Sequence, residues 1–109
     1  MEVKIKSEDV KNRKREYEIS GDISVQNIDL LAAKMKDAVS ACDVLTVNLK
    51  QITGFDVAAF QFFYSLKNSF IRDKKCLTVK CGLSNEVSQL LLNCGIKDLA
   101  ETLSYKNEN

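Results

Sequence analysis

VLTVNLKQITGFDVAAFQFFYSLKNSF, residues 44–70, is the stretch of this sequence that decides the fold. In its first seven residues apolar side chains alternate with Thr46 and Asn48, which predicts a strand with one buried face. After Asp56 the apolar residues recur at intervals of three and four, which predicts a helix. They are Ala59, Phe62, Phe63, Leu66 and Phe70. A strand that leads directly into a helix indicates an α/β fold.

Upstream of this stretch the apolar period changes twice. Alternating apolar residues predict an N-terminal β-hairpin, with Val3 and Ile5 in one strand and Tyr17 and Ile19 in the other. Its connection, Lys11 to Arg15, is basic but has no interleaved aromatic residues, so we interpret it as a solvated loop. A period of three to four residues then predicts one amphipathic helix over residues 28–42, capped by Ser24 or Asn27.

Downstream of residue 70 the sequence predicts one more strand and one more helix. The strand is indicated by alternating Leu77, Val79 and Cys81. The helix is indicated by apolar residues at helical spacing, Val87, Leu90, Leu91 and Cys94. We expect Ser84 to cap this helix and Gly95 to end it in the left-handed conformation. From Tyr105 the chain is polar, and we expect a frayed tail.

The predicted element order is β-β-α-β-α-β-α in a single domain, 1–109, with its core at about 17–103. Strands joined through helices are expected to be parallel, because crossovers in one sheet are right-handed. Alternation within the strands predicts helices packed mainly on one face of the sheet. We therefore expect an α/β domain with a mixed four- to five-stranded sheet and three main helices.

Composition narrows the classes of function. Lys and Arg number 16 and Asp and Glu 15, so no overall field favours nucleic acid. No apolar stretch reaches the roughly 20 residues that span a bilayer, and the N-terminus has no signal-peptide core. We expect a cytoplasmic protein that does not insert into membranes.

The sequence also argues against an enzyme. There is no histidine, so neither a Ser-His-Asp nor a Cys-His arrangement is possible, and no phosphate-binding glycine motif is present. The four cysteines have no CxxC spacing, so we expect no metal and interpret them as small core residues. They are Cys42, Cys76, Cys81 and Cys94. No catalytic residue and no cofactor are predicted.

Four segments, in register, resemble the STAS domain, the fold of bacterial anti-sigma factor antagonists and of the cytosolic tails of sulfate transporters. They are ISGDIS at 19–24, VLTVNL at 44–49, ITGFD at 52–56 and GLSNEVSQLLLNCGI at 82–96. The resemblance covers the chain from about Tyr17 to Leu103. It implies a bacterial regulatory module that acts by binding other proteins.

The resemblance also implies where a regulatory site would lie. Family members commonly carry Asp-Ser-[Ser/Thr/Ala]-Gly-Leu at the turn before this helix, and a partner kinase phosphorylates the serine. Here Asp56 matches, but Val57 replaces the phosphoacceptor and Ala59 the glycine, so Val57 is a degenerate phosphosite. Asn48 and Ser24 likewise stand where acidic residues are frequent. Ala58 and Gln61 resemble a subset with Asp-Thr-Ala-Gly-Leu-Gln, associated with chemotaxis or two-component clusters.

Two classes of function follow. The first is a protein-docking module centred on Asp56, Val57, Ala58 and Gln61, with Asp56 also capping the helix. Its partner would be an anti-sigma factor, a kinase-like protein or a chemotaxis protein. The second is a sensor that binds a nucleotide or lipid at the same helix N-terminus. A STAS subunit of a lipid-transport ABC complex is a variant of the first. Phosphorylation elsewhere, at Thr53, Ser65 or Ser69, remains open.

Overall fold

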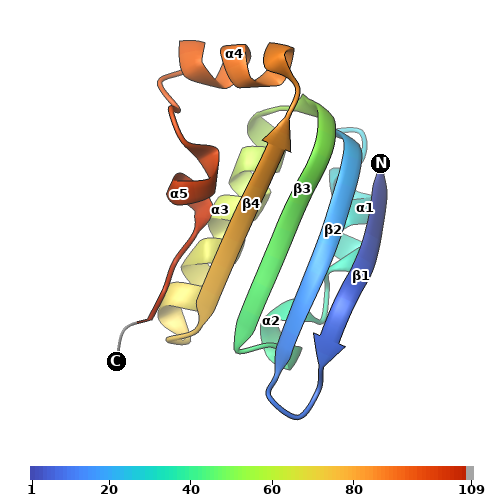
Figure 1. Ribbon diagram of the computed structural model, residues 1–109, viewed down its shortest axis with the longest axis vertical. Coiled ribbons are helices and arrows are strands. Elements are labelled where there is room, and N and C mark those ends of the chain that lie inside the picture. The colour runs from blue at the N-terminus through green and yellow to red at the C-terminus, as the bar shows by residue number, and fades with distance from the viewer. Residues whose placement is uncertain (108–109) are drawn as a thin grey trace.

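The computed structural model describes residues 1–107 and contains a four-stranded sheet in the order β1-β2-β3-β4 (Figure 1). The strands are β1 (Glu2–Asp9), β2 (Lys14–Ile23), β3 (Val44–Phe55) and β4 (Cys76–Leu83). β1 and β2 form the predicted antiparallel hairpin, while β2, β3 and β4 run parallel. The α/β class, the mixed sheet and the parallel crossovers are thus confirmed.

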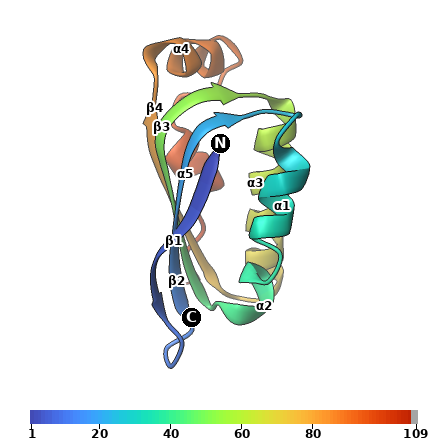
Figure 2. The same cartoon turned by 90° about the vertical axis from the view of Figure 1, so that its right-hand side faces the viewer.

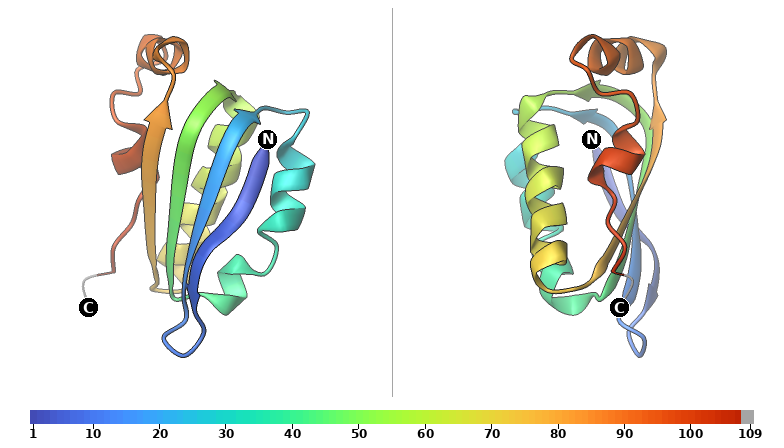
Figure 3. Two further views of the ribbon diagram at one scale, coloured as in Figure 1. Left: turned by 45° about the vertical axis from the view of Figure 1, so that its right-hand side comes forward. Right: turned by 90° about the vertical axis from the view of Figure 1, so that its left-hand side faces the viewer.

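Five helices accompany the sheet in the described part of the chain: α1 (Ile28–Lys34), α2 (Ala38–Ala41), α3 (Val57–Arg72), α4 (Asn85–Asn93) and α5 (Leu99–Leu103). Figure 2 shows α1, α2 and α3 on the same face of the sheet. α4 lies across the end of the sheet where β3 and β4 finish, and α5 packs between β4 and α3 (Figure 3). Within residues 1–107, no helix has the length and apolar character needed to cross a lipid bilayer.

The core lies between the sheet and α3. Leu45, Val47 and Leu49 of β3 are fully buried, and Phe63 and Phe70 of α3 are fully buried against them. Burying a side chain of this size contributes about 1.5–3 kcal/mol, so β3 and α3 hold much of the stability of the domain. The strand and the helix expected in residues 44–70 are therefore confirmed, but β3 continues to Phe55, through most of the segment 51–56 that the sequence predicts as a turn.

The predicted helix over residues 28–42 is wrong in one respect, because the structure has two helices there. The chain leaves the helical path after Lys34 and re-enters it at Ala38, with Asp37 at the N-cap position of α2. The Asp37 carboxylate pairs with Arg15 of β2 at 3.0 Å. The Asp37 side chain makes no capping hydrogen bond to α2, because its carboxylate accepts from the Arg15 guanidinium instead. Neither predicted cap is made, since the Asn27 side chain instead donates to the Asp22 carbonyl.

The caps of α4 are confirmed, but its buried face is narrower than predicted. Ser84 Oγ accepts from the Val87 amide at 3.3 Å, and Gly95 ends the helix with φ +86°. Leu90 and Cys94 are exposed, contrary to prediction, because α4 crosses the strand ends and buries only Val87 and Leu91.

The cysteines are only partly the core residues that the sequence predicts. Cys42 is buried, Cys76 and Cys81 are half-buried, and Cys94 is exposed; none of the four forms a disulfide. Burial raises the pKa of Cys42, and it raises the pKa of Cys81 to about 11. Both thiols therefore stay protonated and unreactive at neutral pH.

The C-terminal segment is more ordered than the sequence suggests. Asp98 caps the unpredicted helix α5 by accepting from the Glu101 amide at 3.1 Å. Tyr105, expected to begin a frayed tail, exchanges two backbone hydrogen bonds of 2.7 Å with Leu77 of β4. At five residues α5 is too short to give a periodic signal. Residues 108 and 109 of the predicted tail lie outside the described part.

Arg15 is not part of a solvated loop. It points inward from β2, as Tyr17 and Ile19 do, and is only 8% exposed. Its guanidinium donates to Glu8 at 2.6 Å, to Asp37 at 3.0 Å and to the Tyr17 hydroxyl at 2.9 Å. One buried cation thus joins β1, β2 and the start of α2.

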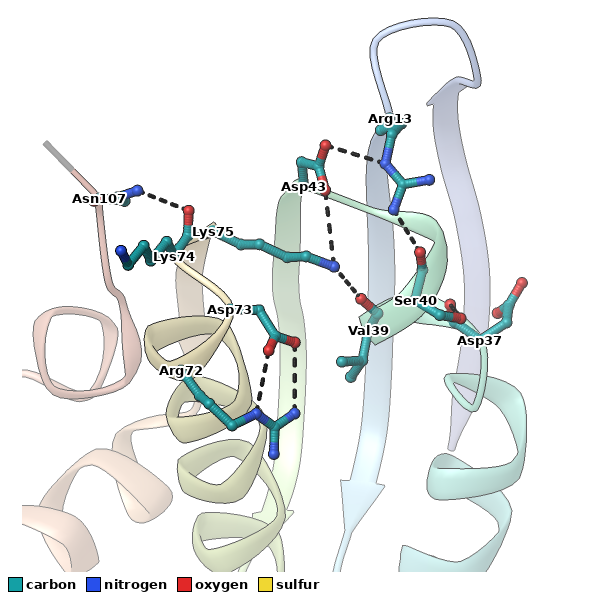
Figure 4. Close-up of polar contacts among 10 residues, drawn as sticks. All are labelled: Arg13, Asp37, Val39, Ser40, Asp43, Arg72, Asp73, Lys74, Lys75 and Asn107. Carbon is teal, nitrogen blue, oxygen red and sulfur yellow. Dashed lines mark hydrogen bonds and ion pairs between the residues drawn. The ribbon is translucent and has the colours of Figure 1, made fainter. Parts of the chain in front are cut away.

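A second set of polar contacts lies at the same end of the molecule, near the turn of the β1–β2 hairpin (Figure 4). The Asp43 carboxylate, just before β3, lies 3.0 Å from Arg13 Nε and 3.7 Å from Lys75 Nζ. Lys75 also donates to the Val39 carbonyl of α2. These contacts join the hairpin, α2 and the start of β4.

We expect Arg15→Ala to lower the free energy of unfolding by about 2 kcal/mol, because it leaves the buried Tyr17 hydroxyl and two carboxylates without their donor. Urea denaturation followed by circular dichroism measures this. Arg72→Ala is the matched control: it removes an exposed pair with Asp73, and should cost less than about 1 kcal/mol. Equal losses in the two variants would contradict a special role for Arg15.

Candidate functional site

Asp56 organises the turn between β3 and α3. It has an extended backbone at the N-cap of α3, and its Oδ1 accepts from the Ala59 amide at 3.1 Å. Its Oδ2 accepts from the Val25 amide at 2.8 Å, in the segment that follows β2. The predicted N-cap is confirmed. The same carboxylate also joins two loops that are far apart in sequence.

The contacts of Asp56 keep it ionised. Hydrogen bonds, first from the Val25 amide and then from Ala59 and Ala58, lower the pKa of its carboxyl below the ordinary value of 3.8. Partial desolvation acts in the opposite direction and is weaker. At neutral pH a fixed negative charge therefore stands at the N-terminus of α3, where the helix dipole favours it.

The four predicted docking residues lie on the first two turns of α3. Val57 is 70% exposed, Gln61 is exposed, and Asp56 and Ala58 are half-buried. We call Asp56, Val57, Ala58 and Gln61 the α3 surface. Because Val57 and Gln61 are four residues apart, they face the same side of the helix.

The structure adds an apolar groove beside Val57 that sequence reasoning missed. It has a volume of about 320 Å³ and lies between the start of α3 and the helix α4. We call it the α3–α4 groove; its lining is Phe55, Asp56, Val57, Phe60, Leu90, Leu91, Cys94 and Ile96. The sequence signal for it was the run Leu90-Leu91-Leu92, because three consecutive apolar residues cannot all lie on one face of a helix.

Asp22 is an acidic residue two positions before Ser24 and lies beside the segment that precedes α3. It pairs in register with Gly54, and a Cβ atom at Gly54 would lie 2.1 Å from Asp22 Oδ1. A side chain at residue 54 of the ITGFD segment would therefore force the Asp22 carboxylate to move. The Ser24 hydroxyl donates to the Asp22 carboxylate at 3.3 Å.

The chemistry of these groups is that of a binding surface. Among residues 1–107 no three potential ligands of the His, Cys, Asp and Glu types come together as a metal site. The α3 surface offers one ionised carboxylate, an amide side chain and exposed apolar atoms. Such groups bind a partner by burial, hydrogen bonding and charge.

Comparison with known proteins identifies the family of this chain and a solved structure with a similar fold. The family model for the STAS domain matches residues 6–108. A solved structure of the anti-sigma factor antagonist SpoIIAA in its unphosphorylated form is similar, with a TM-score of 0.65 and 13% sequence identity. That similarity covers 88% of this chain and 83% of the other. No curated protein matches the sequence.

We expect Asp56→Ala to lower the free energy of unfolding by about 1 kcal/mol, because it removes the cap of α3 and the contact with Val25. Asp56→Asn should lose less, since an amide oxygen still accepts one hydrogen bond. Urea denaturation of the three proteins measures both differences.

The difference in free energy of unfolding between the wild type, with aspartate at residue 56, and the asparagine variant should also depend on pH. A carboxyl with a lowered pKa stabilises the fold above its unfolded-state pKa, and this stabilisation is lost as the pH falls through the folded value. The difference between the wild type and Asp56→Asn should therefore be constant near pH 7 and should shrink below pH 3.8. A difference that is unchanged at low pH would contradict a role for the charge.

Proposed function

The chain belongs to the STAS domain family, and from this we propose that it is a non-catalytic regulatory module that docks a protein partner through the α3 surface. Domains of this family are in general non-catalytic and typically bind proteins. The proposed partner is an anti-sigma factor, a kinase-like protein or a chemotaxis protein, in the cytoplasm of a bacterium.

The observation that carries this proposal is the exposure of Val57 at the first position of α3. A valine that is 70% exposed beside an ordered carboxylate contributes nothing to the core. Covering this side chain with a partner would contribute about 25 cal/mol of binding free energy for each Å² of apolar area removed from water. Asp56 fixes the backbone around it, so the surface is already ordered before binding.

The substitution of the phosphoacceptor supports a constitutive interaction. Phosphorylation would add nearly two negative charges at the centre of the α3 surface, but Val57 has no hydroxyl to accept a phosphate. We infer that control of the complex, where there is any, acts on the partner or at another residue. The narrower likeness to chemotaxis-associated sequences through Ala58 and Gln61 is part of this proposal.

The geometry supports protein docking better than nucleotide sensing. A phosphate at a helix N-terminus binds free backbone N–H groups, in the field of the helix dipole. Here the Asp56 carboxylate already accepts from the Ala59 amide and places a negative charge at that position. A phosphate would have to displace it and would be repelled by it.

We expect Val57→Asp to weaken partner binding at least tenfold, which corresponds to about 1.4 kcal/mol. The variant should fold normally, because Val57 is exposed and an acidic residue is favoured in the first turn of a helix. The partner is first identified by affinity capture from the native lysate and mass spectrometry. Its affinity for the purified variants is then measured by calorimetry.

Val10→Asp is the matched control, since Val10 is 77% exposed at the far end of the molecule, in the hairpin turn. It should bind the partner as the wild type does. Unchanged affinity of Val57→Asp would contradict the placement of the interface. An equal loss in both variants would show that the added charge, and not the α3 surface, weakens binding.

A further inference from the structure

The α3–α4 groove extends the α3 surface into a concave apolar site. Val57 belongs to both, and the opposite wall is formed by α4 through Leu90, Leu91 and Cys94. Leu90 is 54% exposed, and Leu92 beside it is also exposed. Two helices that diverge around an apolar groove provide the geometry in which proteins bind the apolar face of a third helix.

The lining of the α3–α4 groove contains Asp56 and no Lys or Arg. Residues 16–33, 51–66 and 81–96 contain the groove residues and the surrounding loops, and none of them is Lys or Arg. All 16 basic residues lie elsewhere in the sequence. The basic residue next to the groove lining in sequence is Lys97, and Asp98 follows it directly.

Acidic groups stand around the groove instead. Asp56 is part of its lining, Glu86 lies one helical turn before Leu90 on α4, and Asp22 lies beside Gly54. The groove also includes Cys94 at the C-terminal end of α4, where the helix dipole is negative. The one charged side chain in the lining is thus acidic, Glu86 adds a second negative charge nearby, and Lys97 is the basic residue that follows the lining residue Ile96.

We propose that the α3–α4 groove binds an amphipathic helix of the partner whose apolar face enters the groove and whose polar side is basic. The inference rests on the proposed function, because it names the chemistry of the partner segment that meets the α3 surface. Apolar burial supplies the affinity, and the acidic surroundings select basic over acidic helices.

The test uses two synthetic peptides of three heptads with the same leucines on one face. One has lysine at its polar positions and the other has glutamate. The lysine peptide should bind at least tenfold more tightly, as measured by calorimetry, and its advantage should shrink at high ionic strength. In amide NMR spectra the shifted resonances should be those of Val57, Phe60, Leu90 and Ile96.

Matched variants test the apolar and the charged contributions separately. Leu90→Ala should weaken binding of the lysine peptide at least fivefold, whereas Leu30→Ala, at a 49% exposed leucine of α1, should not. Glu86→Gln should reduce the preference for lysine over glutamate peptides, whereas Glu101→Gln on α5 should leave it unchanged. All four positions are exposed, so the variants should keep their fold.

Equal affinity for the two peptides would overturn the inference about charge, and shifts confined to the open face of the sheet would overturn the groove itself. These results are distinguishable from failure of the proposed function. If neither peptide binds but Val57→Asp still disrupts the native complex, the docking function stands and the helical, basic partner is wrong. If both tests are negative, the α3 surface is not an interface.

Discussion

The structure depends on the burial of one face of β3. This strand is paired on both sides, so its backbone groups are satisfied within the sheet, and its inward side chains must be covered by another element. α3 follows β3 after a single residue, Asp56, and returns antiparallel across that face with Phe63 and Phe70. The crossovers on either side, through α1 and α2 and through α3, then place their helices on the same face.

This arrangement explains how Asp56 stabilises the fold and also takes part in the proposed docking surface. The residue must end a strand and begin a helix, and its carboxylate does so by accepting the Ala59 amide. Its second oxygen holds the Val25 amide, so the loops after β2 and β3 are fixed together. The next side chain, Val57, is outside the core as a consequence. The rigid turn that the fold needs is therefore the same turn that exposes Val57, the centre of the proposed docking surface.

The site was predictable where it is local and unpredictable where it is not. The cap at Asp56 and the cap of α4 at Ser84 both depend on neighbours within one helical turn. The α3–α4 groove depends on how α4 lies across the strand ends, and its walls come from residues more than 30 positions apart, such as Val57 and Leu90. The helical period predicts that Leu90 lies on the buried face of α4. In the structure only Val87 and Leu91 of this helix are buried, and Leu90 is exposed.

Period and composition were enough to establish the order of the four strands along the chain, the parallel crossovers and the helix that follows Asp56, because each depends on the spacing of apolar side chains along a short segment. Tertiary contacts determined the burial of Arg15, the break before α2 and the pairing of Tyr105 with Leu77. Each of these requires a partner distant in sequence, and its energy exceeds the local preference that predicted a loop, a continuous helix or a frayed tail. The physical reason is that local propensities are worth tenths of a kcal/mol per residue, whereas a buried ion or ladder contact is worth about 1 kcal/mol or more.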